Sequence, residues 1–99
     1  MELQARIIDK RRGLNNFIEL KFNGYEIQAN IFDEGSHYGI EEGCISKLWI
    51  RKDFKVVYNW DRGEDINIID INDLEMIVDA IGQIDQSGLT KQYQTITII

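Results

Sequence analysis

Apolar and polar residues alternate along the first third of the chain, a pattern typical of β-strands that bury one face. The segment from Leu3 to Asp9 places apolar side chains at every second position and predicts a first strand, with a short helix as the competing interpretation. The run Lys10-Arg11-Arg12-Gly13 follows it. Three like charges in a row predict an exposed turn, and contact with a phosphate or an acidic partner is the alternative.

The strongest local signal is the sequence Phe22-Asn23-Gly24-Tyr25, which predicts a β-hairpin. Asn-Gly tolerates the positive φ that both central positions of a two-residue type I′ turn require. The turn pairs Phe22 with Tyr25 and so sets the register of both strands. We expect one face to pair Leu20 with Ile27 and Ile18 with Ala29 in the core, and the other to pair Lys21 with Glu26 and Glu19 with Gln28 in solvent.

A second hairpin is predicted from Ile45–Arg51 and Phe54–Trp60, two aromatic and β-branched segments on either side of Lys52-Asp53. Apolar residues fall on both faces of these strands: Leu48, Ile50 and Val57 on one, and Trp49, Val56 and Trp60 on the other. Strands of this kind lie centrally in a sheet or carry an exposed patch that meets a partner.

A helix is predicted near residues 72–86, because apolar residues recur there at helical spacing: Leu74, Ile77, Val78, Ile81 and Ile84. Asn72 and Glu75 match a capping box, and Ile71 is spaced to pack onto Met76. Gly88 is the expected stop.

The last segment, Lys91–Ile99, is rich in β-branched residues, and we expect it to pair within the sheet, since an unpaired apolar strand favours aggregation. The predicted fold is therefore α+β, an antiparallel sheet of five or six strands packed by one main helix. Ninety-nine residues and 11.6 kDa indicate one domain over residues 1–99, because so short a chain cannot fill a second core.

The composition of the chain indicates in which cellular compartment we expect the protein. No aliphatic run is long enough for a membrane-spanning helix, and the first residues lack the pattern of a secretory signal. The single cysteine, Cys44, cannot form an internal disulfide, which fits a reducing compartment. We therefore expect a cytoplasmic protein without a membrane partner.

The net charge of −6 is concentrated at one end of the chain. Residues 1–60 hold nine basic and nine acidic residues, whereas residues 61–99 hold Arg62 and Lys91 against eight acids. Phosphate backbones repel such a segment, so direct nucleic-acid binding is disfavoured and a basic protein partner is favoured. A solvated surface that keeps the protein soluble is the alternative interpretation.

Catalytic and metal-binding patterns are weak. His37 lies in a polar, glycine-rich segment, residues 33–44, whose carboxylates lack the spacing of a calcium loop. Cys44 and His37 lack an oxyanion motif or a third group, and the glycines form no phosphate loop. Trp49 and Trp60 are suited to stacking a base or to core packing. We expect no enzyme activity, no cofactor and no metal.

The segment Asp61-Arg62-Gly63-Glu64-Asp65 is predicted to form a charged turn, in which Arg62 stands alone between Asp61 and Glu64-Asp65. A guanidinium can bridge two carboxylates and lock such a turn, and ligand binding is its alternative role.

The region from Gly24 to Asp65 resembles a family of small proteins of unknown function from phages and low-GC Gram-positive bacteria. The resemblance rests on Gly24 and on three segments: Ser36-His37-Tyr38-Gly39-Ile40, Gly43-Cys44-Ile45-Ser46-Lys47-Leu48 and Asp61-Arg62-Gly63-Glu64-Asp65. Trp60 stands where that family usually has tyrosine, and Glu64 where it usually has tryptophan. The resemblance implies a phage or prophage accessory protein that acts inside the host cell.

These observations together predict a non-enzymatic protein that binds and inhibits a host protein with a basic surface, as anti-defence proteins such as anti-CRISPR inhibitors do. The expected partner-binding residues are Asp61, Arg62, Glu64, Asp65, Asp79, Asp85, His37 and Tyr38. The alternative is a module that binds a small anionic ligand or assembles into a virion or a homo-oligomer.

Overall fold

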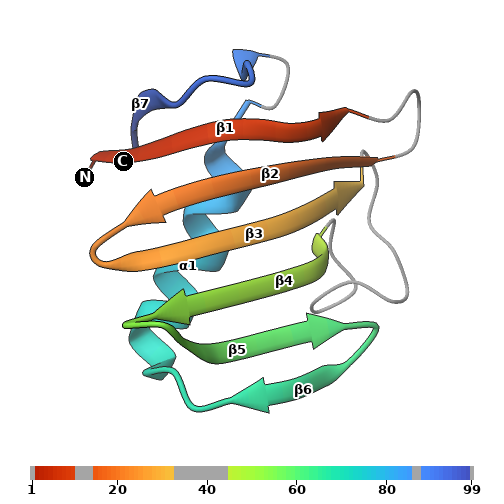
Figure 1. Ribbon diagram of the computed structural model, residues 1–99, viewed down its shortest axis with the longest axis vertical. Helices are drawn as coiled ribbons and strands as arrows, with labels where there is room; N and C mark the ends of the chain where they lie inside the picture. The colour runs from red at the N-terminus through yellow and green to blue at the C-terminus, as the bar shows by residue number, and fades with distance from the viewer. Residues whose placement is uncertain (1, 11–14, 33–44, 86–87, 99) are drawn as a thin grey trace.

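The computed structural model describes residues 2–10, 15–32, 45–85 and 88–98. In these residues seven strands form one antiparallel sheet, in the order β6-β5-β4-β3-β2-β1-β7, and a single helix packs across one face (Figure 1). The elements are β1 (Glu2–Lys10), β2 (Asn15–Phe22), β3 (Tyr25–Phe32), β4 (Ile45–Lys52), β5 (Lys55–Asp61), β6 (Glu64–Asn67), α1 (Ile71–Gln83) and β7 (Gln94–Thr97). The α+β prediction is confirmed, with one strand more than the highest number expected.

The predicted first hairpin is confirmed in register. Phe22 pairs with Tyr25, and the four further pairs derived from the turn all occur. Asn23 and Gly24 have φ values of 51° and 83°, as a type I′ turn requires. The expected first strand also forms, as β1, and it includes Lys10; the rest of the basic run lies outside the described residues.

The second hairpin forms one residue further along than predicted. Its turn is Asp53-Phe54, with φ values of 52° and 64°, and the Phe54 side chain is 95 % exposed. Trp60 pairs with Leu48 and packs against the core, so its expected place on the Trp49 face is wrong. The reason is a register shift between Ile50 and Arg51, because an extra residue in one strand displaces the in-and-out alternation by one position.

Strand β6 differs from the predicted fold, because the sequence assigns its first two residues, Glu64 and Asp65, to a charged turn. Its pattern contains a single half-buried side chain, Ile66, and so lacks the alternation that marks a strand. Backbone pairing with β5 creates it: Tyr58 lies opposite Asn67 and Asn59 opposite Ile66.

The helix begins with a different cap from the one expected. Asp70 is the N-cap, and its carboxylate accepts hydrogen bonds from the backbone N–H groups of Asn72 (2.8 Å) and Asp73 (3.3 Å). The Asn72–Glu75 capping box is therefore wrong, since both residues lie inside the helix. Ile71, expected to pack onto Met76, is 58 % exposed.

The helix also ends earlier than residue 86. Ile84 adopts an extended conformation (φ −77°, ψ 128°) and ends it, so Gly88 is not the stop. Ile84 is nonetheless buried, which is why its side chain continued the apolar pattern past the end of the helix.

Helix α1 returns the chain from one edge of the sheet to the other. It follows β6 and passes behind the strands toward β1 and β7 (Figure 1). Thirteen residues span about 20 Å, against about 29 Å for six strand spacings, so residues after the helix complete the crossing. There the Thr90 carbonyl accepts a hydrogen bond of 2.8 Å from the Ile7 N–H, and β7 pairs with β1, as expected for the last segment.

The core lies between α1 and the sheet face that it covers, which we call the helix face. Ile77 and Ile81 are 1 % and 3 % exposed, which confirms their predicted core positions. They pack over a layer of buried strand residues that includes Ile18, Leu20, Ile27, Leu48 and Ile50.

Truncation of Ile77 or Ile81 to alanine should lower the free energy of unfolding by about 2–5 kcal/mol each, because a cavity remains where the side chain packed. Urea unfolding measures this loss. Glu75→Ala, on the exposed side of the same helix, should stay within about 0.5 kcal/mol of wild type. Equal stability of all three variants would contradict this assignment of the core.

Candidate partner-binding surface

The structure places six of the eight predicted binding residues, and all six are exposed: Asp61, Arg62, Glu64, Asp65, Asp79 and Asp85. His37 and Tyr38 lie outside the described residues, as does the rest of the glycine-rich segment with Cys44. The six do not form one cluster. Four lie at the β5–β6 turn, one lies on α1 and one follows the helix.

The β5–β6 turn group is a charged hairpin end with local partners. Arg62 has a positive φ of 62°, and the Asp61 N–H donates to the Gly63 carbonyl at 3.1 Å across the turn. The Asp61 carboxylate lies 4.0 Å from Lys47 Nζ, and Glu64 accepts a 2.8 Å hydrogen bond from Asn67. The proposed bridge from Arg62 to two carboxylates stays a prediction.

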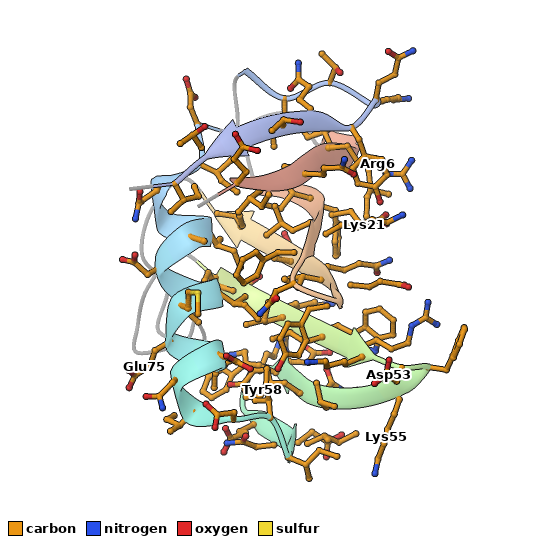
Figure 2. The ribbon with its side chains drawn as sticks, turned by 90° about the vertical axis from the view of Figure 1, so that its left-hand side faces the viewer. Arg6, Lys21, Asp53, Lys55, Tyr58 and Glu75 are labelled. Carbon is orange, nitrogen blue, oxygen red and sulfur yellow. The ribbon has the colours of Figure 1, made fainter. Side chains whose placement is uncertain are left out.

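The second group belongs to what we call the acidic side: Asp70, Asp73, Glu75, Asp79 and Asp85, on α1 and its flanks. Figure 2 shows Glu75 on the helix, on the opposite side of the molecule from Arg6 and Lys21. Asp79 accepts a hydrogen bond of 2.9 Å from the Gln83 side chain, a neutral donor. The sequence contains no lysine or arginine from residue 63 to residue 90. Glu75 is exposed but is absent from the predicted binding residues, because the sequence pattern places it in a capping box.

One carboxylate of the acidic side has a structural partner. Tyr25 of β3 donates a hydrogen bond of 2.5 Å from its hydroxyl to Asp73 in the first turn of α1. The contact joins residues 48 positions apart. This hydrogen bond, together with burial, raises the pKa of Tyr25 to about 12. Asp73 therefore ties the helix to the sheet and leaves Glu75 and Asp79 to face solvent.

The sheet face opposite α1, which we call the open face, carries charges of both signs that pair with one another. Glu19 accepts hydrogen bonds from Arg6 Nη2 at 2.9 Å and from the Tyr93 hydroxyl. Arg6 and Lys21 each lie 4.8 Å from the centre of the Tyr93 ring. Burial raises the pKa of Glu19, but the hydrogen bonds from Tyr93 and Arg6 outweigh it and hold that pKa below its ordinary value.

A second cluster on the open face joins β3 and β4. Arg51 forms an ion pair with Glu26, and its guanidinium lies 5.4 Å from the Trp49 ring. Glu26 was expected to complement Lys21 across the hairpin, and its ion pair is with the neighbouring strand instead. Trp49 is half-buried under this contact. Each of the two clusters pairs an arginine with a glutamate, so these four charges are balanced locally.

A shallow, open depression of about 540 Å³ lies where the β2–β3 turn meets the start of β1. Its lining includes Glu2, Glu26 and Lys21. These side chains carry both signs, and Glu26 is already paired with Arg51, so the depression has no cluster of cations that would favour the small anionic ligand of the alternative interpretation.

In the described part of the chain, no group of three or more His, Cys, Asp or Glu side chains is placed to hold a metal ion. None of its helices has the length and apolar character needed to cross a membrane.

The fold and surface define a small α+β protein: a seven-stranded antiparallel sheet, covered by one helix in the described residues, with the five carboxylates of the acidic side on that helix and its flanks. Residues 16–83 match the family described as a domain of unknown function, DUF7678. The match covers more than half of the chain, and the protein belongs to this family. No curated protein and no solved structure matches the sequence. The expected membership of a family of unknown function is thus confirmed, whereas a phage or Gram-positive origin stays a prediction.

The Tyr25–Asp73 hydrogen bond predicts how stability depends on pH. Tyr25, Tyr58 and Tyr93 each have a pKa raised to about 12, with burial among the causes at all three. The unfolded chain loses these phenol protons near pH 10 and the folded chain near pH 12. Their contribution to stability is therefore complete below pH 10 and is lost as the pH rises toward 12.

Tyr25→Phe should lower stability at pH 7 by about 1–3 kcal/mol, because Asp73 loses a buried donor. The variant should also show a shallower fall in the free energy of unfolding between pH 10 and pH 12, since it has one titrating phenol fewer. Urea unfolding across this pH range measures both effects. Glu75→Gln, a carboxylate change elsewhere on α1, should leave the slope at its wild-type value; an unchanged slope in Tyr25→Phe would refute the assignment.

Proposed function

We propose that this protein is a non-enzymatic binding protein whose acidic side docks against a basic protein surface. One observation carries the proposal: seven acids and no lysine or arginine lie between residues 63 and 90, the segment that contains α1. Glu75 and Asp79 project from that helix into solvent and lie four residues apart. Like charges at this spacing destabilise a helix by a few tenths of a kcal/mol, and a cationic partner would relieve that repulsion.

The contrast between the two faces supports the same proposal. Charges on the open face are paired across strands, as Arg6 with Glu19 and Arg51 with Glu26 show. The carboxylates of the acidic side therefore dominate the electrostatic field of the molecule. A field of one sign steers an oppositely charged partner toward that side.

More specifically, the protein acts as an inhibitor of a host protein. Carboxylates on a helix can occupy a basic groove where phosphates of a nucleic acid would otherwise lie. The resemblance of residues 24–65 to phage accessory proteins supports a partner in the bacterial cytoplasm and an anti-defence role, including that of an anti-CRISPR inhibitor. Direct nucleic-acid binding is disfavoured by the same carboxylates.

The test starts by capturing a partner. Immobilised wild-type protein is exposed to a lysate of the organism that carries the gene at about 0.1 M salt, where charges interact over about 10 Å. We expect it to retain its partner under these conditions and to release that partner at high salt. The purified partner is then used to measure association rates by surface plasmon resonance.

We expect Glu75→Lys and Asp79→Lys each to slow association by about threefold or more, and rising salt to slow the wild type similarly, because steering depends on the net field at that surface. Glu2→Lys is the matched control: it makes the same charge change at an exposed position on β1, and should leave the rate nearly unchanged. An association rate indifferent to salt and to both helix reversals would refute the acidic-side mechanism.

A further inference from the structure

The two edges of the sheet differ in chemistry. Strand β6 forms one edge and begins with Glu64 and Asp65, charges of the kind that protect an edge from pairing with another strand. Strand β7 forms the other edge, and its sequence, Gln-Thr-Ile-Thr, has neither a charge nor a proline. The sheet order ends at β7, so one row of its backbone groups has no strand partner in the described part of the chain.

The direction of each backbone group in β7 follows from one hydrogen bond. The Ile7 N–H donates to the Thr90 carbonyl. The odd-numbered residues of β1 from Leu3 to Ile7 therefore direct their backbone N–H and C=O groups toward the segment that contains Thr90 and β7. Leu3 pairs with Ile96, and this pair is therefore hydrogen-bonded. Alternation then directs the N–H and C=O groups of Thr95 and Thr97 outward, to the open edge.

The hydrogen-bonding pattern of the first hairpin leads independently to the same assignment of backbone directions in β1. Phe22 and Tyr25 flank a two-residue turn and so form a hydrogen-bonded pair, which directs the backbone groups of Lys21 toward β1. Lys21 lies opposite Gln4. Gln4 thus bonds to β2, and its neighbour Leu3 bonds to β7.

We propose that β7 pairs antiparallel with β7 of a second copy of this chain, about a two-fold axis at Ile96. In this register Thr95 of each copy lies opposite Thr97 of the other. The two pairs together make four backbone hydrogen bonds. Ile96 lies opposite its own counterpart at the axis, as a closely spaced pair without hydrogen bonds.

Self-complementarity identifies a second copy as the occupant. A two-fold axis matches threonine with threonine and isoleucine with isoleucine, and these are favourable cross-strand pairs. Ile96 is half-buried on the helix face, so the pairing covers the remainder of an apolar side chain. Backbone hydrogen bonds accept any extended segment, but a second copy always presents the same Thr-Ile-Thr sequence in this register.

Two copies that each carry a net charge of −6 repel one another at long range, which weakens the dimer, but the β7 strand that forms the contact carries no charge itself. The β6 edge carries Glu64 and Asp65 at the far side of the sheet, six strand spacings or about 29 Å from β7. That separation exceeds the screening length of about 8 Å at physiological salt. A four-residue edge buries little area, so the dimer belongs to the weak class, with a Kd on the order of 0.1 mM.

The dimer is independent of the proposed function, since it leaves the acidic side of both copies uncovered. Sedimentation equilibrium of the full chain tests it, over a concentration range of about 10 μM to 1 mM that brackets the expected Kd. We expect the apparent mass to rise toward twice 11.6 kDa. A wild-type chain that stays at the monomer mass throughout would overturn the proposal, whatever the outcome with a basic partner.

Proline variants locate the interface. Thr95→Pro and Thr97→Pro each remove one outward N–H and keep the β1 ladder, so both should remain monomeric with a wild-type circular dichroism spectrum. Thr95→Val is the matched control: it keeps the N–H and the β-branched shape, and should dimerise as the wild type does. Dimerisation of either folded proline variant at the wild-type Kd would place the interface elsewhere and overturn the proposal.

Amide hydrogen exchange of the wild type gives a readout that needs no substitution. The amides of Thr95 and Thr97 should become several-fold more protected as concentration rises through the Kd, whereas Gln94 and Ile96, already bonded to β1, should change little. Protection at Thr95 and Thr97 that is independent of concentration while the mass doubles would equally overturn the proposal.

Discussion

The packing of one helix across one face of a wide sheet is the constraint on which the rest of this structure depends. Ile77 and Ile81 close the core against the central strands, and the chain beyond α1 must still reach β1 to complete the sheet. The Thr90 carbonyl and β7 complete that return. No described element covers the other face, and charged residues there pair with one another across the strands. The Arg6–Glu19–Tyr93 and Arg51–Glu26 clusters do so.

The same layering separates the charges. A helix that buries one stripe has only its outer side left for polar residues, and here every charged residue on that side is acidic. Asp73 is drawn inward by the Tyr25 hydroxyl, which leaves Glu75 and Asp79 as the outward pair. The sheet keeps a balanced face and concentrates its exposed backbone at the two edge strands. The acidic side and the neutral edge of β7 are thus two separate surfaces suited to two different partners.

Local chemistry is sufficient to predict about half of this architecture from the sequence. The Asn23-Gly24 turn sets its own register, because the two positive φ values and the period of two leave one way to pair the strands. The core positions of α1 follow from the helical period for the same reason. The acidic segment and the exposure of Asp61, Glu64, Asp65, Asp79 and Asp85 could also be predicted, since charges in a small domain remain in solvent.

Tertiary structure decided what local patterns do not encode. The bulge that turns Trp60 inward, the strand β6 and the early end of α1 at Ile84 depend on pairing and packing with segments far along the chain. The Tyr25–Asp73 hydrogen bond joins residues 48 positions apart, and no periodicity signals such a contact. The sequence by itself determined the turns, the buried stripes and the sign of the charge. Only the folded sheet decided which carboxylates share a surface and which strand is left at the edge, because both depend on the spatial order of the elements.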